Sequence, residues 1–97
     1  MARIVHSPQA IEDLVRLWQF LRDVAPDNAD AAIEEILDGI DMLAAHPLVG
    51  RRVEGEKREF VVSRGVTGYV ALYVFDPLRE IILVLRIRHQ RESGFSD

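Results

Sequence analysis

The chain of 97 residues contains no cysteine, only four prolines and a single lysine. Without cysteine it can form neither a disulfide nor a thiolate metal site, which suits a reducing compartment. Its longest apolar run, residues 69–75, is far shorter than the roughly 20 residues that a membrane helix needs. The first residues also lack the apolar segment of a signal peptide. We therefore expect one soluble, cytoplasmic domain over residues 1–97, without membrane contact.

The short motifs of common enzyme classes are also missing. There is no glycine-rich phosphate loop, no H-E-x-x-H and no G-x-S-x-G, and the three histidines do not have metal-ligand spacing. We expect neither a metal nor a cofactor. The paired acids Glu12–Asp13 and Glu34–Glu35 lie on the predicted polar sides of helices, where a solvated face is the expected role.

The charge of the chain is unevenly distributed. The net charge is −4, yet the cationic residues gather in the second half of the chain, and Lys57 is the one cation there that is not an arginine. Arginine favours planar, bidentate contacts with carboxylate or phosphate groups. An acidic total is nevertheless a poor match for a protein that binds nucleic acid through its phosphates.

The pattern predicts a strand, two helices and a three-stranded meander. Ser7 followed by Pro8 is typical of a helix start. The first helix then carries the apolar stripe Ile11, Leu14, Val15, Trp18, Leu21 and Val24, and the second carries Ala29, Ile33, Ile36, Leu37, Ile40, Leu43 and Ala44. Strands are predicted at 2–6, 58–63, 69–75 and 80–88, with a turn at 76–79 and a polar loop, including a short extended piece, at 48–57. We expect a two-layer α+β domain of order β-α-α-β-β-β, in which an α-helical hairpin packs on one face of an antiparallel sheet.

One face of this sheet has no helices to cover it. Residues 69–75 are apolar on both faces, so their spacing alone does not show which set faces the helices. On the last strand the helix-facing set is expected to be Ile81, Leu83, Leu85 and Ile87, and the opposite set Ile82, Val84, Arg86 and Arg88. An uncovered apolar patch is typical of a binding site, unless the 48–57 loop or the C-terminal residues fold over it.

The residues best suited to chemistry lie near the end of the last strand. They are Arg86, Arg88, His89 and Arg91. Arginines can stabilise the transition state of phosphoryl transfer, and a histidine of near-neutral pKa can move a proton. On spacing alone, however, a non-catalytic role is favoured.

Five short motifs occur in order along the whole chain. They are Ser-Pro-x-Ala-x-x-Asp-Leu at 7–14, His-Pro-x-x-Gly-Arg at 46–51, Arg-Glu-Phe at 58–60, Gly-Tyr-Val-Ala-Leu-Tyr at 68–73, and Leu-Arg-Ile-Arg-His-Gln-Arg-Glu at 85–92. Their order and spacing resemble the RelE/ParE superfamily of bacterial type II toxin–antitoxin toxins, often labelled plasmid stabilisation proteins. The resemblance implies a growth-inhibiting toxin and a partner, the cognate antitoxin, whose C-terminal segment wraps and silences it.

The resemblance also implies an orientation for the sheet. Tyr69 and Tyr73 would face the helices. The antitoxin-binding residues on the other face would then be Val70, Leu72, Val74, Ile82 and Val84.

Two activities occur in the superfamily. RelE-like members are ribosome-dependent mRNA endonucleases with basic residues on the second and third strands, where this chain has Glu59, Val61 and Val70. ParE-like members inhibit DNA gyrase. The resemblance therefore favours gyrase as the target, with target-binding residues Arg58, Arg86, Arg88 and His89. An mRNA endonuclease that acts on the ribosome and uses the tail cluster, and a non-toxic homodimeric interaction module, are the alternatives.

Overall fold

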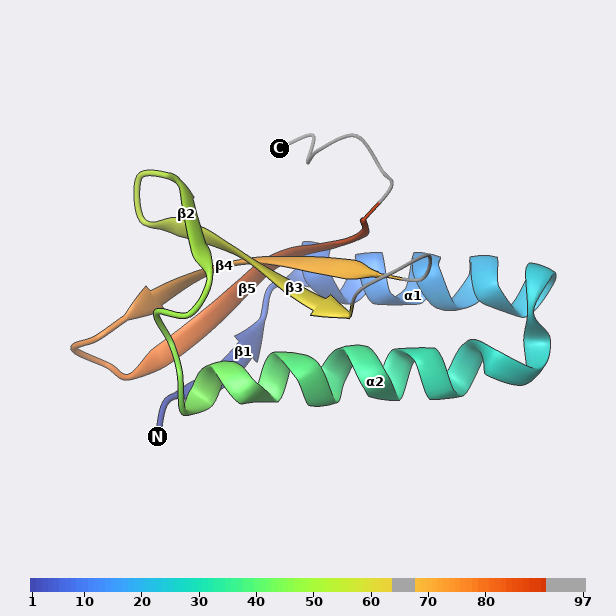
Figure 1. The fold of residues 1–97 in the computed structure, drawn as a ribbon, viewed down its shortest axis with the longest axis horizontal. Helices are drawn as coiled ribbons and strands as arrows, with labels where there is room; N and C mark the ends of the chain where they lie inside the picture. Colours follow the sequence, from blue (N-terminus) through green and yellow to red (C-terminus); the bar gives the residue numbers. More distant parts are fainter. Residues whose placement is uncertain (64–67, 91–97) are drawn as a thin grey trace.

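The described residues form a helical hairpin and a five-stranded sheet, whose arrangement Figure 1 shows. In the computed structural model, residues 1–63 and 68–90 are described. The elements are β1 (Arg3–His6), α1 (Pro8–Val24), the 3-10 turn η1 (Pro26–Asn28), α2 (Ala29–Asp41), the 3-10 turn η2 (Met42–Ala44), β2 (Arg51–Glu54), β3 (Lys57–Ser63), β4 (Tyr69–Asp76) and β5 (Ile81–His89). Within the described ranges, neither helix is both long and apolar enough to cross a membrane.

The strands lie in the order β1-β5-β4-β3-β2. Strands β2 to β5 pair antiparallel with their chain neighbours, whereas β1 pairs parallel with β5, from Arg3 opposite Ile81 to His6 opposite Val84. The predicted α+β fold is confirmed, with two differences in detail. The sheet is mixed rather than antiparallel, because β5 runs beside β1 in the same direction. The long connection that a parallel pair requires consists of the helical hairpin and strands β2 to β4. The loop at 48–57 also contributes the edge strand β2.

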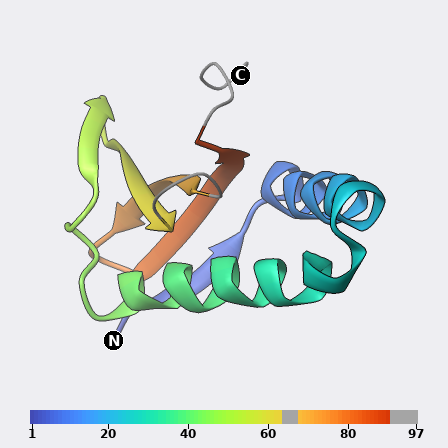
Figure 2. The same cartoon turned by 45° about the vertical axis from the view of Figure 1, so that its right-hand side comes forward.

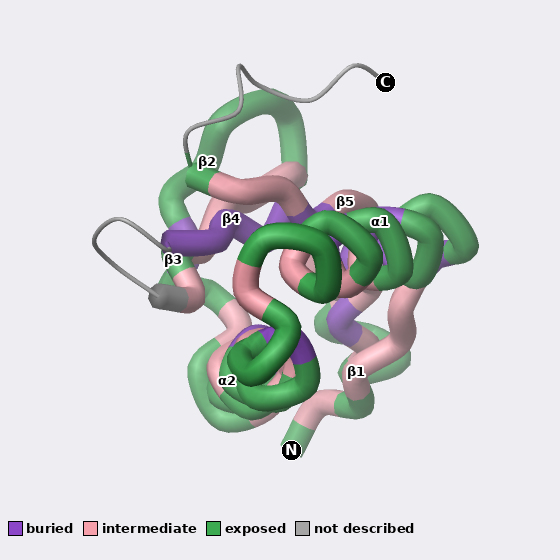
Figure 3. The backbone as a smooth tube through the Cα atoms, turned by 90° about the vertical axis from the view of Figure 1, so that its right-hand side faces the viewer, coloured by how far each residue is buried: buried purple, intermediate pink, exposed green. Residues whose placement is uncertain are grey.

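Both helices lie on one side of the sheet, with α1 along β5 and α2 along β3 (Figure 2). The buried residues lie mainly on β4, at several positions of β5 and on the inward sides of the helices (Figure 3). From α2 and η2 the core receives Ile36, Ile40 and Leu43, so the predicted stripe of the second helix is confirmed. Gly39 allows α2 to approach the sheet closely, since a Cβ at this position would collide with Val62 of β3.

The apolar stripe predicted for the first helix is confirmed only in part: Leu14 packs against the core, but no member of the stripe is fully buried. The buried residues of α1 are Ala10, Asp13 and Leu17, whereas Ile11 and Val15 are about half exposed. The prediction assumed that only apolar side chains face the interior. In the structure a carboxylate on the inward face binds the sheet.

A β-bulge interrupts β5. Leu72 of β4 pairs with Arg86, but the next residue, Tyr73, pairs with Val84, so Leu85 is an extra residue in β5. An extra residue reverses the alternation of side chains between the two parts of a strand.

The bulge decides which residues of β5 face the helices. Ile82 and Val84 before it and Ile87 after it are all fully buried in the core. The expectation that Ile82 and Val84 lie on the uncovered face is therefore wrong, because it assumed unbroken alternation along the strand. For the same reason Ile81 and Leu83 lie opposite the helices rather than against them.

Strand β4 is uninterrupted and has the orientation that the resemblance implied. Tyr69 and Tyr73 belong to the core, whereas Val70 and Leu72 lie on the face opposite the helices, called here the open face. Val70 and Leu72 are each only 4% exposed, because charged side chains of β3 and β5 stand beside them. Of the three β4 residues expected to bind antitoxin, Val74 is the most accessible.

Candidate functional site

A hollow on the open face of the sheet is the candidate functional site. Its volume is about 460 Å³, and the residues that line it are Val49, Arg51, Glu59, Phe60, Val61, Val70, Arg88 and Gln90. Cross-strand pairing brings Arg51 beside Glu59 and Val61 beside Val70. The lining thus joins apolar side chains with two arginines and one glutamate, which suits a ligand that is partly apolar and partly charged.

Glu59 lies at the centre of the charges in this hollow. One carboxylate oxygen of Glu59 is 3.0 Å from Nη2 of Arg51, and the other is 3.7 Å from Nη2 of Arg88. The Arg51 side chain is 76% exposed, whereas the side chains of Glu59 and Arg88 are 20% and 13% exposed. Arg88 also donates to the carbonyl oxygens of His89 and Gln90, so the end of β5 fixes its position.

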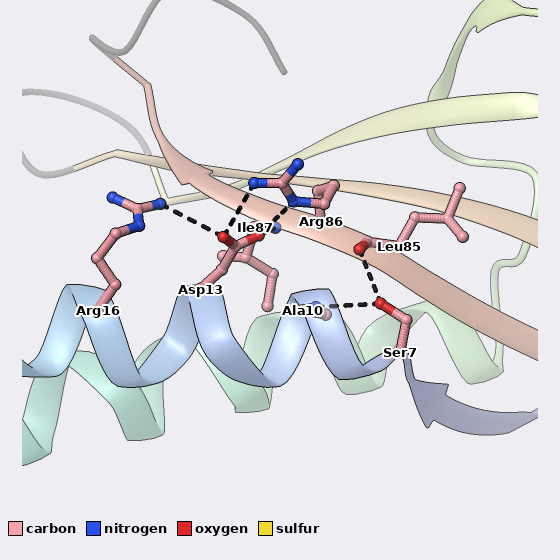
Figure 4. A network of polar contacts seen from close by, with 7 residues as sticks. All are labelled: Ser7, Ala10, Asp13, Arg16, Leu85, Arg86 and Ile87. Atoms are coloured by element: carbon pink, nitrogen blue, oxygen red, sulfur yellow. Dashed lines mark hydrogen bonds and ion pairs between the residues drawn. The ribbon is translucent and has the colours of Figure 1, made fainter. Parts of the chain in front are cut away.

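A second network joins α1 to the edge of β5 (Figure 4). Strand β1 ends at His6, and α1 then takes its place beside β5. The Ser7 hydroxyl donates to the carbonyl oxygen of Leu85 and accepts the N–H of Ala10, so it caps both the helix and the strand. Asp13 accepts the backbone N–H of Ile87 at 2.8 Å. These contacts satisfy backbone groups that would otherwise be unpaired at the sheet edge.

Asp13 also holds Arg86, a predicted site residue. Arg86 donates from Nε and Nη2 to the two carboxylate oxygens of Asp13, at 2.9 and 3.2 Å, and Arg16 lies 3.5 Å away. Asp13 is 4% exposed, so the expectation that it lies on a solvated face is wrong. Its burial acts to raise the pKa, but the hydrogen bonds from Arg86 and Ile87 and the charges of Arg86 and Arg16 outweigh burial and hold the pKa below its ordinary value.

Arg58 and Tyr73 anchor the loop before β2. Nη1 of Arg58 donates to the carbonyl oxygens of Leu48 and Gly50, and the Tyr73 hydroxyl donates to Pro47 and accepts the N–H of Gly50. A Cβ at Gly50 would lie 2.6 Å from the Tyr73 hydroxyl oxygen, so only glycine fits there. This explains the glycine of the His-Pro-x-x-Gly-Arg motif and gives Arg58 a role inside the fold.

Replacing Tyr73 with phenylalanine should lower the free energy of unfolding by about 2 kcal/mol, because the buried N–H of Gly50 and the carbonyl of Pro47 lose their partner. Urea denaturation measures the change, and an unaltered m-value would show that both states keep their compactness. A loss below about 0.5 kcal/mol would mean that the loop does not depend on this hydroxyl.

The predicted tail cluster is divided between the two faces of the sheet. His89 pairs with Tyr69 and packs edge-on against its ring, at 5.4 Å between centroids, on the helix side. Arg86 and Arg88 pair with Leu72 and Val70 and therefore lie on the open face. Arg58 lies on the helix side, opposite Tyr73. Arg91 lies outside the described residues.

Sequence reasoning missed three residues of these networks, namely Asp13, Arg51 and Glu59. Asp13 could have been found from its spacing, because it lies three residues after Ala10 and four before Leu17, on one helix face. Arg51 and Glu59 lie on separate strands, and only the pairing of β2 with β3 brings them together.

Comparisons with known proteins identify the family. Residues 4–94 match the family described as the ParE toxin of the type II toxin–antitoxin system parDE. Toxin RelE3 of Caulobacter vibrioides is 39% identical over 92 residues, which cover 95% of this chain and 98% of that toxin. The chain therefore belongs to the ParE toxin family of type II toxin–antitoxin systems. It is a toxin of the RelE/ParE superfamily, as its motifs implied.

Solved structures share its fold. A toxin–antitoxin structure described as the chromosomal ParDE system of P. aeruginosa matches with a TM-score of 0.77 at 22% identity, covering 92% of this chain and 96% of that one. The RelBE2 toxin–antitoxin complex of Mycobacterium tuberculosis matches with a TM-score of 0.61 at 22% identity, covering 92% and 98%. At this identity the likeness concerns the fold alone.

Proposed function

We propose that this toxin inhibits growth by binding DNA gyrase, and that a cognate antitoxin neutralises it by covering the open face. The observation that carries the gyrase proposal is the division of the predicted catalytic cluster. A ribonuclease of the kind considered above needs its arginines and its proton-transferring histidine on the same phosphodiester. Here His89 packs on Tyr69 on the helix side, whereas Arg86 is paired with Asp13 of α1 at the edge of β5 and Arg88 with Glu59 on the open face.

Two further features support gyrase over mRNA. The match over residues 4–94 is to ParE toxins. The chain is acidic, with a net charge of −4, which disfavours docking into ribosomal RNA. We assign target contact to Arg88 with Arg51, which line the hollow, while Arg58 and Arg86 hold the surface in shape.

The competing function is ribosome-dependent mRNA cleavage. One observation favours it, since the relative that is 39% identical is named RelE3. Expression of the toxin in cells without antitoxin separates the two functions, by scoring plasmid supercoiling and mRNA integrity in the same culture. Relaxed plasmid with intact mRNA supports gyrase inhibition, and cleaved mRNA with normal supercoiling supports the nuclease.

Replacing His89 with glutamine should leave growth inhibition nearly unchanged, because no proton transfer is required to bind gyrase. A nuclease that used His89 would lose roughly 100-fold or more of its activity. Killing curves after induction, at matched protein levels, measure the effect. Survival of cells that express the His89→Gln toxin, together with mRNA cleavage by the parent, would contradict the gyrase proposal.

Replacing Val74 with aspartate should weaken antitoxin binding by tenfold or more, on the order of 1.4 kcal/mol, because a charge would have to lose its water at an apolar contact. The fold should persist, since Val74 lies outside the core. Titration of purified antitoxin by calorimetry measures the affinity. An unchanged affinity would remove Val74 from the antitoxin surface.

A further inference from the structure

We infer that Glu59 excludes nucleic acid from the hollow: its carboxylate occupies the place between Arg51 and Arg88 where a backbone phosphate would bind. This makes Glu59 a residue that determines specificity. This inference deepens the proposed function, because a hollow that excludes phosphates favours a protein as the target. It rests on the proposed function where it takes the hollow to be the surface that contacts the target.

The geometry resembles a phosphate site that is already filled. Two guanidinium groups reach the two oxygens of one carboxylate, at 3.0 and 3.7 Å, from strands on either side of it. Guanidinium groups bind phosphate oxygens with the same planar donor geometry. The neighbouring apolar residues Val49, Val61 and Val70, which also line the hollow, could receive the apolar surface of a base or sugar.

Glu59 weakens this hollow as a site for phosphate. It lowers the charge of the lining from +2, for Arg51 and Arg88 alone, to +1, and its carboxylate would stand a few ångströms from any phosphate bound there. At that separation, repulsion between like charges is strong, even near a protein surface. A partner protein can instead use hydrogen bonds and apolar contacts, which this repulsion affects little.

Glu59 differs from the other glutamates of β2, β3 and the turn between them. Its side chain is 20% exposed and is held in the middle of the sheet, between β2 and β4. Glu56 also pairs with an arginine, Arg52, at 3.7 Å, but 87% of its side chain is exposed. Exposed pairs of that kind contribute little and are screened by salt. Glu56 therefore provides a control with the same change in net charge.

The test measures binding of a fluorescein-labelled single-stranded RNA decamer to the full chain by fluorescence anisotropy at low salt. We expect weak binding by the parent, binding at least about tenfold tighter by Glu59→Gln, and a change within about twofold for Glu56→Gln. Adding Arg51→Gln to Glu59→Gln should return the affinity close to that of the parent. Circular dichroism shows whether each variant is folded. If Glu59→Gln is unfolded, Glu59→Ala is measured in its place and is expected to show the same increase in affinity.

Two distinguishable results would overturn the inference. If the parent binds RNA weakly and Glu59→Gln and Glu56→Gln change the affinity equally, the role of Glu59 is contradicted but the gyrase proposal is not. If the parent binds RNA as tightly as Glu59→Gln does, the role of Glu59 and the gyrase proposal are both contradicted.

Discussion

Replacing Asp13 with alanine is expected to destabilise the protein by about 3–5 kcal/mol, because it breaks a buried ion pair and leaves the charge of Arg86 without its partner. The substitution removes the carboxylate that pairs with Arg86 and leaves the N–H of Ile87 without its acceptor. Both partners lie at the contact between α1 and β5, where water reaches them poorly. Thermal and urea unfolding measure the loss, which would be a large part of the 5–15 kcal/mol typical of a domain.

The neighbouring residue supplies the control. Glu12→Ala removes the same charge from the exposed side of α1 and should change stability by less than about 0.5 kcal/mol. Equal losses for Asp13→Ala and Glu12→Ala would show that the contact with Arg86 and Ile87 does not stabilise the fold.

Acid provides a second measurement of the same contact. The folded-state pKa of Asp13 is lowered, so its carboxylate stabilises the fold fully above its unfolded pKa of about 3.9 and loses this contribution as pH falls through the lower, folded value. The difference in stability between the parent and Asp13→Ala should therefore narrow below about pH 4. A difference that stays constant from pH 7 to pH 3 would contradict this account.

Replacing Val84 with aspartate should abolish folding. Val84 is fully buried in the core beneath the helices, and a carboxylate there would be desolvated among apolar side chains, at a cost of several kcal/mol. We expect an unfolded or aggregated protein, seen as loss of the circular dichroism signal and of a cooperative melting transition.

Val74→Asp is the matched comparison. It places the same side chain on the other face of the sheet, where we expect a loss of about 1 kcal/mol and a native spectrum. If Val84→Asp folded and Val74→Asp did not, the face assignment produced by the bulge at Leu85 would be reversed.

These two valines show how far the sequence could predict the fold. The order of elements was predicted, because helix capping, apolar spacing and turn residues are local signals. The orientation of β4 came only from the family resemblance, because this strand is apolar on both faces and its spacing leaves the two orientations open. The orientation of β5 before Leu85 was not predicted, since a bulge arises from pairing between strands and leaves no local mark in an apolar run.

The candidate site was predicted less completely than the fold, for a related reason. The arginines of β5 stood out as charges in an apolar strand, but their partners, Asp13 and Glu59, lie 73 residues from Arg86 and on another strand from Arg88. In the sequence, a carboxylate on a helix is expected to be solvated, because nothing local shows which strand packs beside it. From the sequence alone, the arginines of β5 therefore resemble target-binding residues, whereas in the structure both form ion pairs within the fold.

A supercoiling reaction with purified components tests the central claim most directly. Purified gyrase, ATP and relaxed plasmid are incubated with increasing amounts of the toxin, in parallel with translating ribosomes and an end-labelled mRNA. We expect supercoiling to fall as toxin is added, to recover when cognate antitoxin is present, and the mRNA to remain intact. Unaffected supercoiling, together with toxin-dependent cleavage of the ribosome-bound mRNA, would contradict the gyrase proposal.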